Sequence, residues 1–139
     1  MNPTRHPNGF YVVPLLELFG FRLRLHYWPA ATPDDTPHEH RSWVLSLVFG
    51  ELVETRWREA HGIRAVYRCG ATPGNGAPVA EPCGQGGVEL VKRRTRRWLY
   101  FVGKRTIHSV ECKRRTWTLV LLGRPQQGRR PRAWMHPTA

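Results

Sequence analysis

The stretch Phe21-Arg-Leu-Arg-Leu-His-Tyr-Trp28 decides the fold class. Its odd-numbered positions are apolar and alternate with Arg22, Arg24, His26 and Trp28, as in a strand with one apolar and one polar face. No long window of the chain repeats apolar residues at the three-and-four spacing of an amphipathic helix. Instead, 13 glycines and 12 prolines separate short runs rich in Val, Leu, Trp, Tyr and Thr. We therefore predict an all-β chain.

Similar runs on the C-terminal side of this stretch are predicted to be further strands. They are Trp43–Phe49, Leu52–Trp57, Ile63–Cys69, Val88–Val91, Trp98–Val102, Ile107–Cys112 and Thr116–Leu122. We expect the second run to pair with the third, and the last two runs to pair with each other, because each pair is joined by a short polar turn.

Three other segments have a different character. Phe10–Phe19 is predicted to be a strand that ends in a helical turn near Leu15–Leu18, and Pro14 should disturb the strand. Gly70–Gly87 is dominated by Gly, Pro and Ala, which predicts a long surface loop. Lys92–Arg97 is a basic cluster between two predicted strands.

The length of 139 residues suits one domain. We expect a single domain over 1–139, with a core at about 21–122 and irregular terminal segments. No apolar run reaches the ~20 residues that cross a bilayer, and the N-terminus lacks the pattern of a signal peptide. We therefore expect a cytoplasmic protein with no membrane partner. The cysteines Cys69, Cys83 and Cys112 are odd in number and widely spaced, which favours reduced thiols; a Cys69–Cys83 disulfide is the alternative.

The chain carries a net charge of +12, from 22 basic and 10 acidic residues. Such a charge favours anionic partners such as nucleic acid. The clusters Lys92–Arg97, Lys113–Arg115 and Arg129–Arg132, with Trp98 and Trp134 close by, would serve a nucleic-acid-binding β-barrel. The alternative is that arginines coat solvated strand faces, and we favour it, so nucleic acid is not the expected partner.

The triplet His38-Glu39-His40 carries the chemistry. On a strand, residues i and i+2 point to the same face, so both imidazoles can reach one ion at a distance of roughly 2 Å. A third ligand must come from a distant strand. His108 is the best candidate, because it follows a glycine-containing turn, Gly103-Lys-Arg-Thr-Ile107, that leads into a strand. These histidines predict a site for one divalent metal ion.

These motifs resemble those of the cupin superfamily. Its first motif, a His-x-His pair followed by a carboxylate and then a glycine, is similar to His38–His40 with Trp43–Gly50, and its second motif is similar to Gly103–Val110. The resemblance covers about residues 21–122 and implies a small β-barrel, or jelly roll, with a metal inside. The usual glutamate near Ser42–Leu45 is missing, and so is the proline of the second motif. The three-histidine set therefore resembles thiol dioxygenases and related cupins.

Other residues are predicted to line the cavity of such a barrel. Arg24 and His26 share the polar face of their strand, and we expect Arg24 to bind a substrate carboxylate. His26 or Glu54 would handle protons, and Glu54, which follows Gly50 by four residues, could instead be a carboxylate ligand of the metal. Further substrate-binding candidates are Ser46, which has the strand parity of His40, and the aromatic residues Tyr67 and Tyr100.

The function that these features favour is that of a metal-dependent enzyme. We expect an Fe(II) oxygenase for a small carboxylate-bearing or amino-acid-like molecule, as in a tailoring step of secondary metabolism. Three histidines also accept Zn, Ni, Cu or Mn. The alternatives are a cupin that uses zinc or another metal for non-redox chemistry, including nitrogen–nitrogen bond formation, a non-catalytic ligand-binding cupin, and the nucleic-acid binder. A homodimer is compatible with each of these functions.

Overall fold

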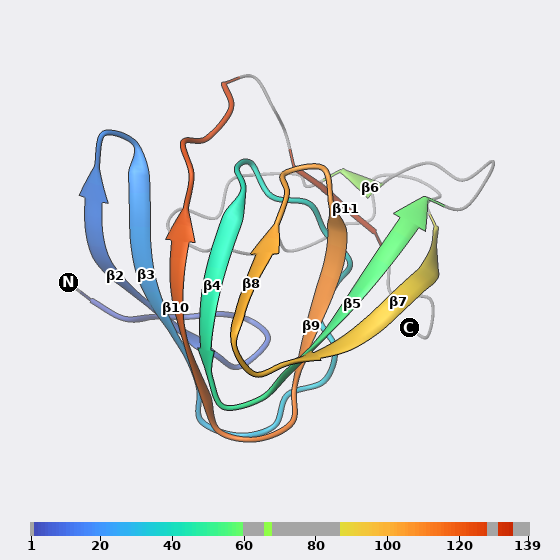
Figure 1. Ribbon diagram of the computed structural model, residues 1–139, viewed down its shortest axis with the longest axis horizontal. Coiled ribbons are helices and arrows are strands. Elements are labelled where there is room, and N and C mark those ends of the chain that lie inside the picture. The colour runs from blue at the N-terminus through green and yellow to red at the C-terminus, as the bar shows by residue number, and fades with distance from the viewer. Residues whose placement is uncertain (1, 60–65, 68–86, 128–130, 135–139) are drawn as a thin grey trace.

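The computed structural model describes residues 2–59, 66–67, 87–127 and 131–134 (Figure 1). Within these ranges the regular structure consists of strands alone, without a helix. The strands are β1 (Thr4–Arg5), β2 (Tyr11–Leu18), β3 (Phe21–Trp28), β4 (Val44–Phe49), β5 (Leu52–Glu59), β6 (Val66–Tyr67), β7 (Val88–Arg96), β8 (Leu99–Val102), β9 (Ile107–Cys112), β10 (Thr116–Leu122) and β11 (Arg132–Ala133). The predicted all-β class is confirmed.

The strands form two main antiparallel sheets and one small one. The six-stranded sheet has the order β1-β2-β3-β10-β4-β8, the three-stranded sheet has the order β7-β5-β9, and β11 pairs with β6. Figure 1 shows the two main sheets curving around a shared interior, with β8 and β9 at their adjoining edges. The sheets stay separate and do not close into one ladder. The result is a cupin-like jelly roll, as the sequence motifs imply.

The interior of the six-stranded sheet follows from strict strand alternation. On β4, Val44, Ser46 and Val48 are buried, and on β10 the even-numbered residues from Thr116 to Leu122 are buried. The register places Val120 opposite Arg24 on one side and Ser46 on the other. The polar face of β3 therefore points into the barrel, and its apolar residues point outward.

The N-terminal hairpin differs from the prediction. β2 remains a strand as far as Leu18, so the helical turn predicted near Leu15–Leu18 is wrong. Its pairing with β3 shifts register between Pro14 and Leu16. This bulge accommodates the proline, which has no N–H to give to the ladder, and the strand then continues because it still has β3 as a partner.

The pairing predicted for neighbouring strands is also wrong. β5 pairs with β7 and β9 and not with β6, while β10 pairs with β3 and β4 and not with β9. The short turns after β4 and β9 carry the chain from one sheet to the other, so strands that are adjacent in sequence are separated in space. The basic cluster 92–97 is mostly part of β7, because several of its arginines have acidic partners across the sheet.

Some predictions fall on parts of the chain outside the described residues. They include the loop at 70–86, the Cys69–Cys83 pair and most of the strand predicted at 63–69. Cys112 is a free, buried thiol. Among the described residues, no helix has the length and apolar character that crossing a membrane requires.

Candidate metal centre and its pocket

Backbone pairing brings the histidines of the two motifs together. His38 and His108 face each other across an antiparallel bridge: the His38 N–H donates to the His108 carbonyl at 2.9 Å, and the His108 N–H donates to the His38 carbonyl at 3.0 Å. On the other side, His38 bridges to Ala133. Directly opposed residues of an antiparallel pair point to the same face. A segment without a long strand of its own therefore presents His38 beside a histidine of β9.

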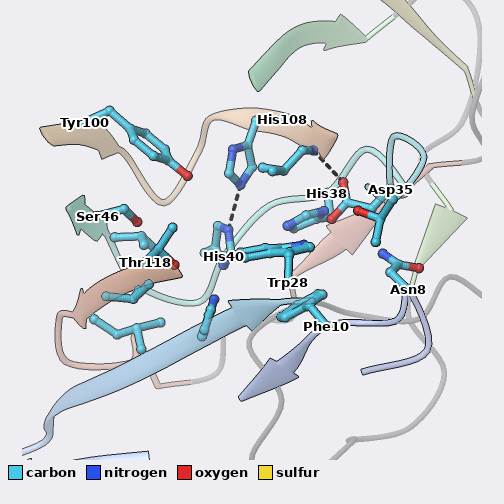
Figure 2. Close-up of a pocket in the computed structure, with 16 residues that line it drawn as sticks. Asn8, Phe10, Trp28, Asp35, His38, His40, Ser46, Tyr100, His108 and Thr118 are labelled. Atoms are coloured by element: carbon cyan, nitrogen blue, oxygen red, sulfur yellow. Dashed lines mark hydrogen bonds between the residues drawn. The ribbon is translucent and has the colours of Figure 1, made fainter. Parts of the chain in front are cut away.

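The three imidazoles converge on one point (Figure 2). One ring nitrogen from each of His38, His40 and His108 lies within 4.8 Å of the others. The Nε2 atoms of His40 and His108 are 2.8 Å apart, and the centroids of the three rings are 4.8 to 5.0 Å apart. His38 and His108 are almost fully buried, whereas His40 is half-buried at the edge of the pocket.

The outer ring atoms of two histidines are fixed by hydrogen bonds. The Nδ1 of His38 lies 2.6 Å from the Thr36 carbonyl, which can only accept, so this Nδ1 carries the hydrogen. The Nδ1 of His108 lies 3.0 Å from Oε2 of Glu54. Both rings therefore turn an Nε2 lone pair toward the cluster. Such convergent lone pairs suit a cation, and the residues fit a divalent metal ion.

His40 is also in the neutral form that a metal ligand needs. Burial, followed by the charges of His38 and His108, lowers the pKa of His40 well below its ordinary value. The imidazole is therefore neutral near neutral pH, and no proton has to leave it before it binds a metal.

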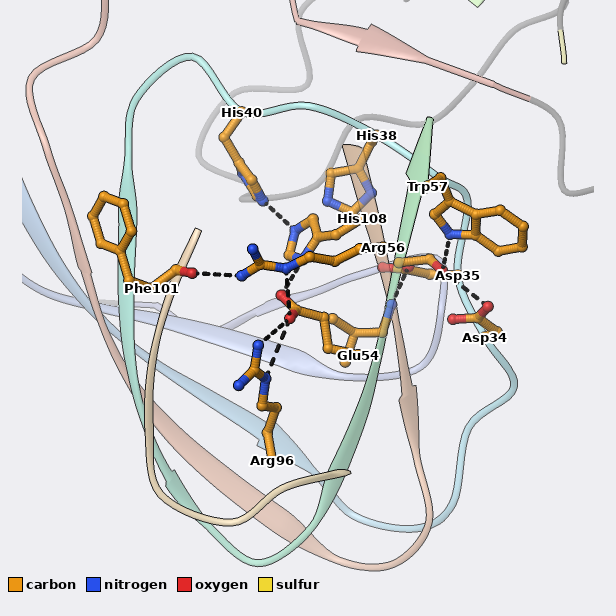
Figure 3. Close-up of polar contacts among 12 residues, drawn as sticks. Asp34, Asp35, His38, His40, Glu54, Arg56, Trp57, Arg96, Phe101 and His108 are labelled. Carbon is orange, nitrogen blue, oxygen red and sulfur yellow. Dashed lines mark hydrogen bonds and ion pairs between the residues drawn. The ribbon is translucent and has the colours of Figure 1, made fainter. Parts of the chain in front are cut away.

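Glu54 contacts the site from behind His108 (Figure 3). Its Oε1 accepts hydrogen bonds from Arg96 at 2.7 Å and from Arg56 at 3.1 Å. Burial alone would raise the pKa of Glu54, but the hydrogen bond and charge of His108, together with Arg96 and Arg56, lower it to about 2. Glu54 is thus an ionised, fully buried carboxylate that contributes to the site through His108, and it is not among the residues that line the pocket.

The cluster forms one wall of a pocket of about 60 Å³. The pocket is lined by the inward face of the six-stranded sheet and by residues of β9. Because one water needs roughly 10–15 Å³ on this measure, the pocket accepts a small molecule of a few heavy atoms beside a metal. Phe10 and Trp28 stack on each other at 4.7 Å and form an apolar wall. Ser46 and Thr118 add polar groups farther along the pocket (Figure 2).

The other residues predicted for the site are placed as follows. His26, Ser46 and Tyr100 line the pocket, and Tyr100 hydrogen-bonds to Ser46. Arg24 lies on the same inward face of β3 and is buried, yet it is not among the lining residues; its Nη1 has no hydrogen-bond partner among the residues that the structure describes. The backbone of Tyr67 pairs with Arg132, but its side chain lies outside the described part.

His26 is neutral in this environment. Burial, followed by the charges of Arg24 and His6, lowers its pKa to about 3. Its Nε2 is buried and has no hydrogen-bond partner within the described part of the chain. The imidazole is therefore a weak base and a good hydrogen-bonding group for a bound molecule.

Asp35 is a pocket residue that sequence reasoning missed. Its Oδ1 accepts a hydrogen bond from the Val110 N–H at 2.7 Å, while burial raises the pKa of this carboxyl well above its ordinary value. A carboxyl group that burial keeps neutral beside the histidine cluster can donate a hydrogen bond to a bound molecule. The signal in the sequence is the acidic pair Asp34-Asp35 just before His38.

Comparison with known proteins supports the fold and leaves the activity open. No family model matches this chain, and no curated protein matches it. Among solved structures, the chain is similar to protein SO0799 from Shewanella oneidensis, with a TM-score of 0.51 and 7% identity over 95% of this chain and 78% of the other. It is also similar to a cupin superfamily protein from Desulfitobacterium hafniense, with a TM-score of 0.49 and 14% identity over 87% of this chain and 83% of the other. At such identities the likeness concerns the fold alone.

Proposed function

We propose that this chain is a metal-dependent enzyme of the cupin type that acts on a small molecule. The observation that carries the proposal is the convergence of His38, His40 and His108 on the wall of a small pocket, with two of the rings oriented by hydrogen bonds at Nδ1. A purely structural histidine cluster would not need unprotonated nitrogens that face one another beside a cavity.

Fe(II) is the ion that we favour, and Zn, Ni, Cu and Mn are the alternatives that the same donors accept. Three neutral ligands leave the full charge of the ion in place, which favours anionic co-ligands and leaves positions open. When bound, Fe(II) supplies redox chemistry with dioxygen, and the function would then be that of an oxygenase. Zinc would instead support non-redox chemistry on the same ligands.

The residues of the chain have distinct tasks in this proposal. Phe10 and Trp28 exclude water from the reacting molecule, because they close one side of the pocket with stacked rings. His26 and Asp35 hold polar atoms of that molecule by hydrogen bonds. Glu54 keeps the proton on Nδ1 of His108, and so keeps Nε2 available.

Arg24 remains our candidate for binding a carboxylate of a small or amino-acid-like substrate. Its guanidinium is buried and shares the inward face of β3 with His26, and one of its nitrogens has no partner in the described ranges. Arg24 does not line the pocket itself, so a carboxylate would have to extend beyond the lining residues to meet it.

Basic residues on the surface do not favour nucleic acid as the ligand. Arg58, Arg93 and Arg97 each pair with a glutamate of the chain itself. These pairs reduce the field that a phosphate backbone would meet, and the small-molecule pocket stays the better-supported binding site.

Metal analysis of the full chain tests the proposal. We expect about one divalent ion per chain after anaerobic loading with Fe(II), and at least a tenfold loss of bound metal in His38→Ala, His40→Ala and His108→Ala, because each variant removes one of three ligands. His26→Ala is the matched control: it changes a histidine of the same pocket that is not in the cluster, and it should keep the metal.

Nitric oxide tests whether a loaded Fe(II) ion keeps a position open for dioxygen. It is a spectroscopic substitute for dioxygen, and an Fe(II) ion with open positions should bind it and give a new paramagnetic signal. Full metal occupancy in His108→Ala would overturn the proposed site. A loaded protein that does not bind nitric oxide would overturn the oxygenase and leave the metal site intact.

A further inference from the structure

The outward side of the six-stranded sheet is apolar across five strands. We call it the outer face; it comprises the odd-numbered positions of Phe21–Tyr27, Leu45–Phe49, Leu99–Phe101 and Trp117–Leu121, together with Tyr11, Val13, Leu16 and Leu18 of β2. Every one of these positions is Val, Leu, Phe, Tyr or Trp. The buried residues that alternate with them already supply the core of the barrel, so the outer face is not needed for that core.

The register makes the outer face continuous. Leu25 lies opposite Leu119, Leu119 opposite Leu47, and Leu47 opposite Leu99, which gives one row of leucines across β3, β10, β4 and β8. In the next row, the rings of Tyr27 and Trp117 stack at 4.1 Å. Figure 1 shows these strands side by side in one gently curved layer. Isolated apolar residues on a surface are ordinary, but a continuous patch marks an interaction site.

Charge is absent from the outer face although it is abundant elsewhere. The chain contains 22 basic and 10 acidic residues, yet none of them occupies a position of this face. By contrast, β7 of the three-stranded sheet carries the charged residues Glu89 and Arg93, which form ion pairs with Arg58 and Glu111. An acidic partner would be drawn to those basic regions. The outer face offers it nothing but apolar contact.

The exposed area suits an association between proteins. Phe49, Leu99 and Phe101 are 53%, 51% and 54% exposed, and Trp117 is 41% exposed. If large side chains present about 150–250 Å² each, the exposed side chains of the outer face, including Leu16, Leu18 and Phe21, offer on the order of 700 Å². A stable interface needs about 800 Å² per partner, and the half-buried leucines between them add to the patch.

We propose that the outer face binds the outer face of a second copy of this chain, giving a two-fold symmetric dimer. Two copies that each carry +12 repel each other through most of their surfaces. They can approach closely only through a face without charge, and this face is uncharged in both copies at once. A two-fold axis brings the same patch against itself, and two twisted sheets pack in this way about 10 Å apart.

Sedimentation velocity of the full chain over a range of concentrations tests this proposal. We expect the wild-type protein to sediment with twice the mass of one chain. Phe101→Glu and Phe49→Glu should each halve that mass, with a dimer dissociation constant raised roughly a hundredfold or more, because a carboxylate would be buried without a partner. Both side chains are more than half exposed, so neither substitution should disturb the fold of the single chain.

Leu90→Glu is the matched control. Leu90 is 57% exposed on β7 of the other sheet, and its replacement should leave the dimer intact. Circular dichroism should be unchanged in all three variants. A wild-type monomer at every concentration would overturn the proposal, whether or not that monomer binds lipid vesicles. Dimers that persist in both phenylalanine variants would overturn it as well.

Discussion

At the scale of single residues, Glu54 controls how His108 is presented. Its carboxylate accepts the Nδ1 hydrogen of His108 and is itself held by Arg96 and Arg56. Replacing Glu54 with Gln keeps the size of the side chain but removes the charge that favours this tautomer and orientation. We expect Glu54→Gln to weaken metal binding about 10- to 100-fold, as the loss of such a hydrogen-bond partner does at other metal sites. Competition with a chelator measures the affinity.

Glu111→Gln serves as the control for this change. Glu111 is also a glutamate that pairs with two basic residues, Arg93 and Lys113, but it lies toward the surface of β9. Metal affinity should not change in this variant. Equal affinities of Glu54→Gln and the wild-type protein would show that Glu54 has no influence on the ligand.

The sequence could predict the histidines of the site but not their hydrogen-bond partners. The His-x-His spacing and the turn before His108 were enough to select three residues that the fold brings together. The task of Glu54 depends on the register of β5 against β9, in which Arg56 lies opposite His108, and no local pattern encodes that register. Asp35 was missed for a similar reason: its carboxyl is placed by a hydrogen bond from Val110 of β9, and not by a strand of its own.

At the scale of the strands, the turn at Gly50 decides whether the chain can pass from one sheet to the other. Gly50 has a φ of 137°, and a Cβ there would lie 2.5 Å from Oγ1 of Thr116. The same Oγ1 accepts a hydrogen bond from the Glu51 N–H at 3.0 Å. We expect Gly50→Ala to lower the free energy of unfolding by about 2–4 kcal/mol, through backbone strain and a steric clash together. Chemical denaturation measures this loss.

Gly103→Ala is the comparison for Gly50→Ala. A Cβ at Gly103 would lie 3.4 Å from the nearest atom, Oγ1 of Thr106, and the backbone there is not in the left-handed region. This variant should change the free energy of unfolding by less than about 1 kcal/mol. If both variants lose the same stability, the contact with Thr116 is not the cause.

Local patterns predicted where strands lie better than which strands pair. The bounds expected for β3, β9 and β10 agree with the structure, because each of these runs is bounded by turn residues. The partners were wrong because a turn such as 113–115 looks the same in sequence whether it closes a hairpin or crosses between sheets. β7 was predicted too short because a run of arginines resembles a loop until Glu54 and Glu111 are seen opposite it.

At the scale of the whole molecule, the pocket residue His26 should make the protein sensitive to acid. Its pKa is about 3 when folded, against an ordinary value of 6.5. The unfolded chain therefore binds a proton between these values and the folded chain does not, so this contribution to stability is complete above pH 6.5 and is lost as the pH falls toward 3. At about two pH units below 6.5 the loss should reach about 2–3 kcal/mol.

Denaturation of the wild-type protein and of His26→Gln, each at neutral pH and near pH 4.5, checks this expectation. The variant has no proton to take up at this position, so its stability should fall less between the two conditions. The other titrating groups are the same in both proteins and cancel in the comparison. Identical losses in the two proteins would show that His26 takes up its proton equally well in the folded and unfolded chains.

The segment 37–40 is held in place by β11 near the C-terminal side of the chain. Glu39 points away from its neighbours His38 and His40, and both of its carboxylate oxygens accept hydrogen bonds from Arg132 of β11, at 2.7 and 3.1 Å. The Glu39 N–H also donates to the Arg132 carbonyl, at 2.8 Å. β11 therefore holds the segment on one side, while the backbone bridge between His38 and His108 holds it on the other side.

The contact between β11 and Glu39 should couple proteolysis of the chain to the supply of the metal. A cut between β10 and β11 would release the strand that anchors Glu39, so the ion should then dissociate faster. Because coupling between two events in one molecule is reciprocal, a bound ion should in turn slow the detachment of β11 and protect the C-terminal side from proteases. A cell short of the metal would then degrade this protein sooner, and the amount of protein would follow the supply of the metal without any dedicated sensor.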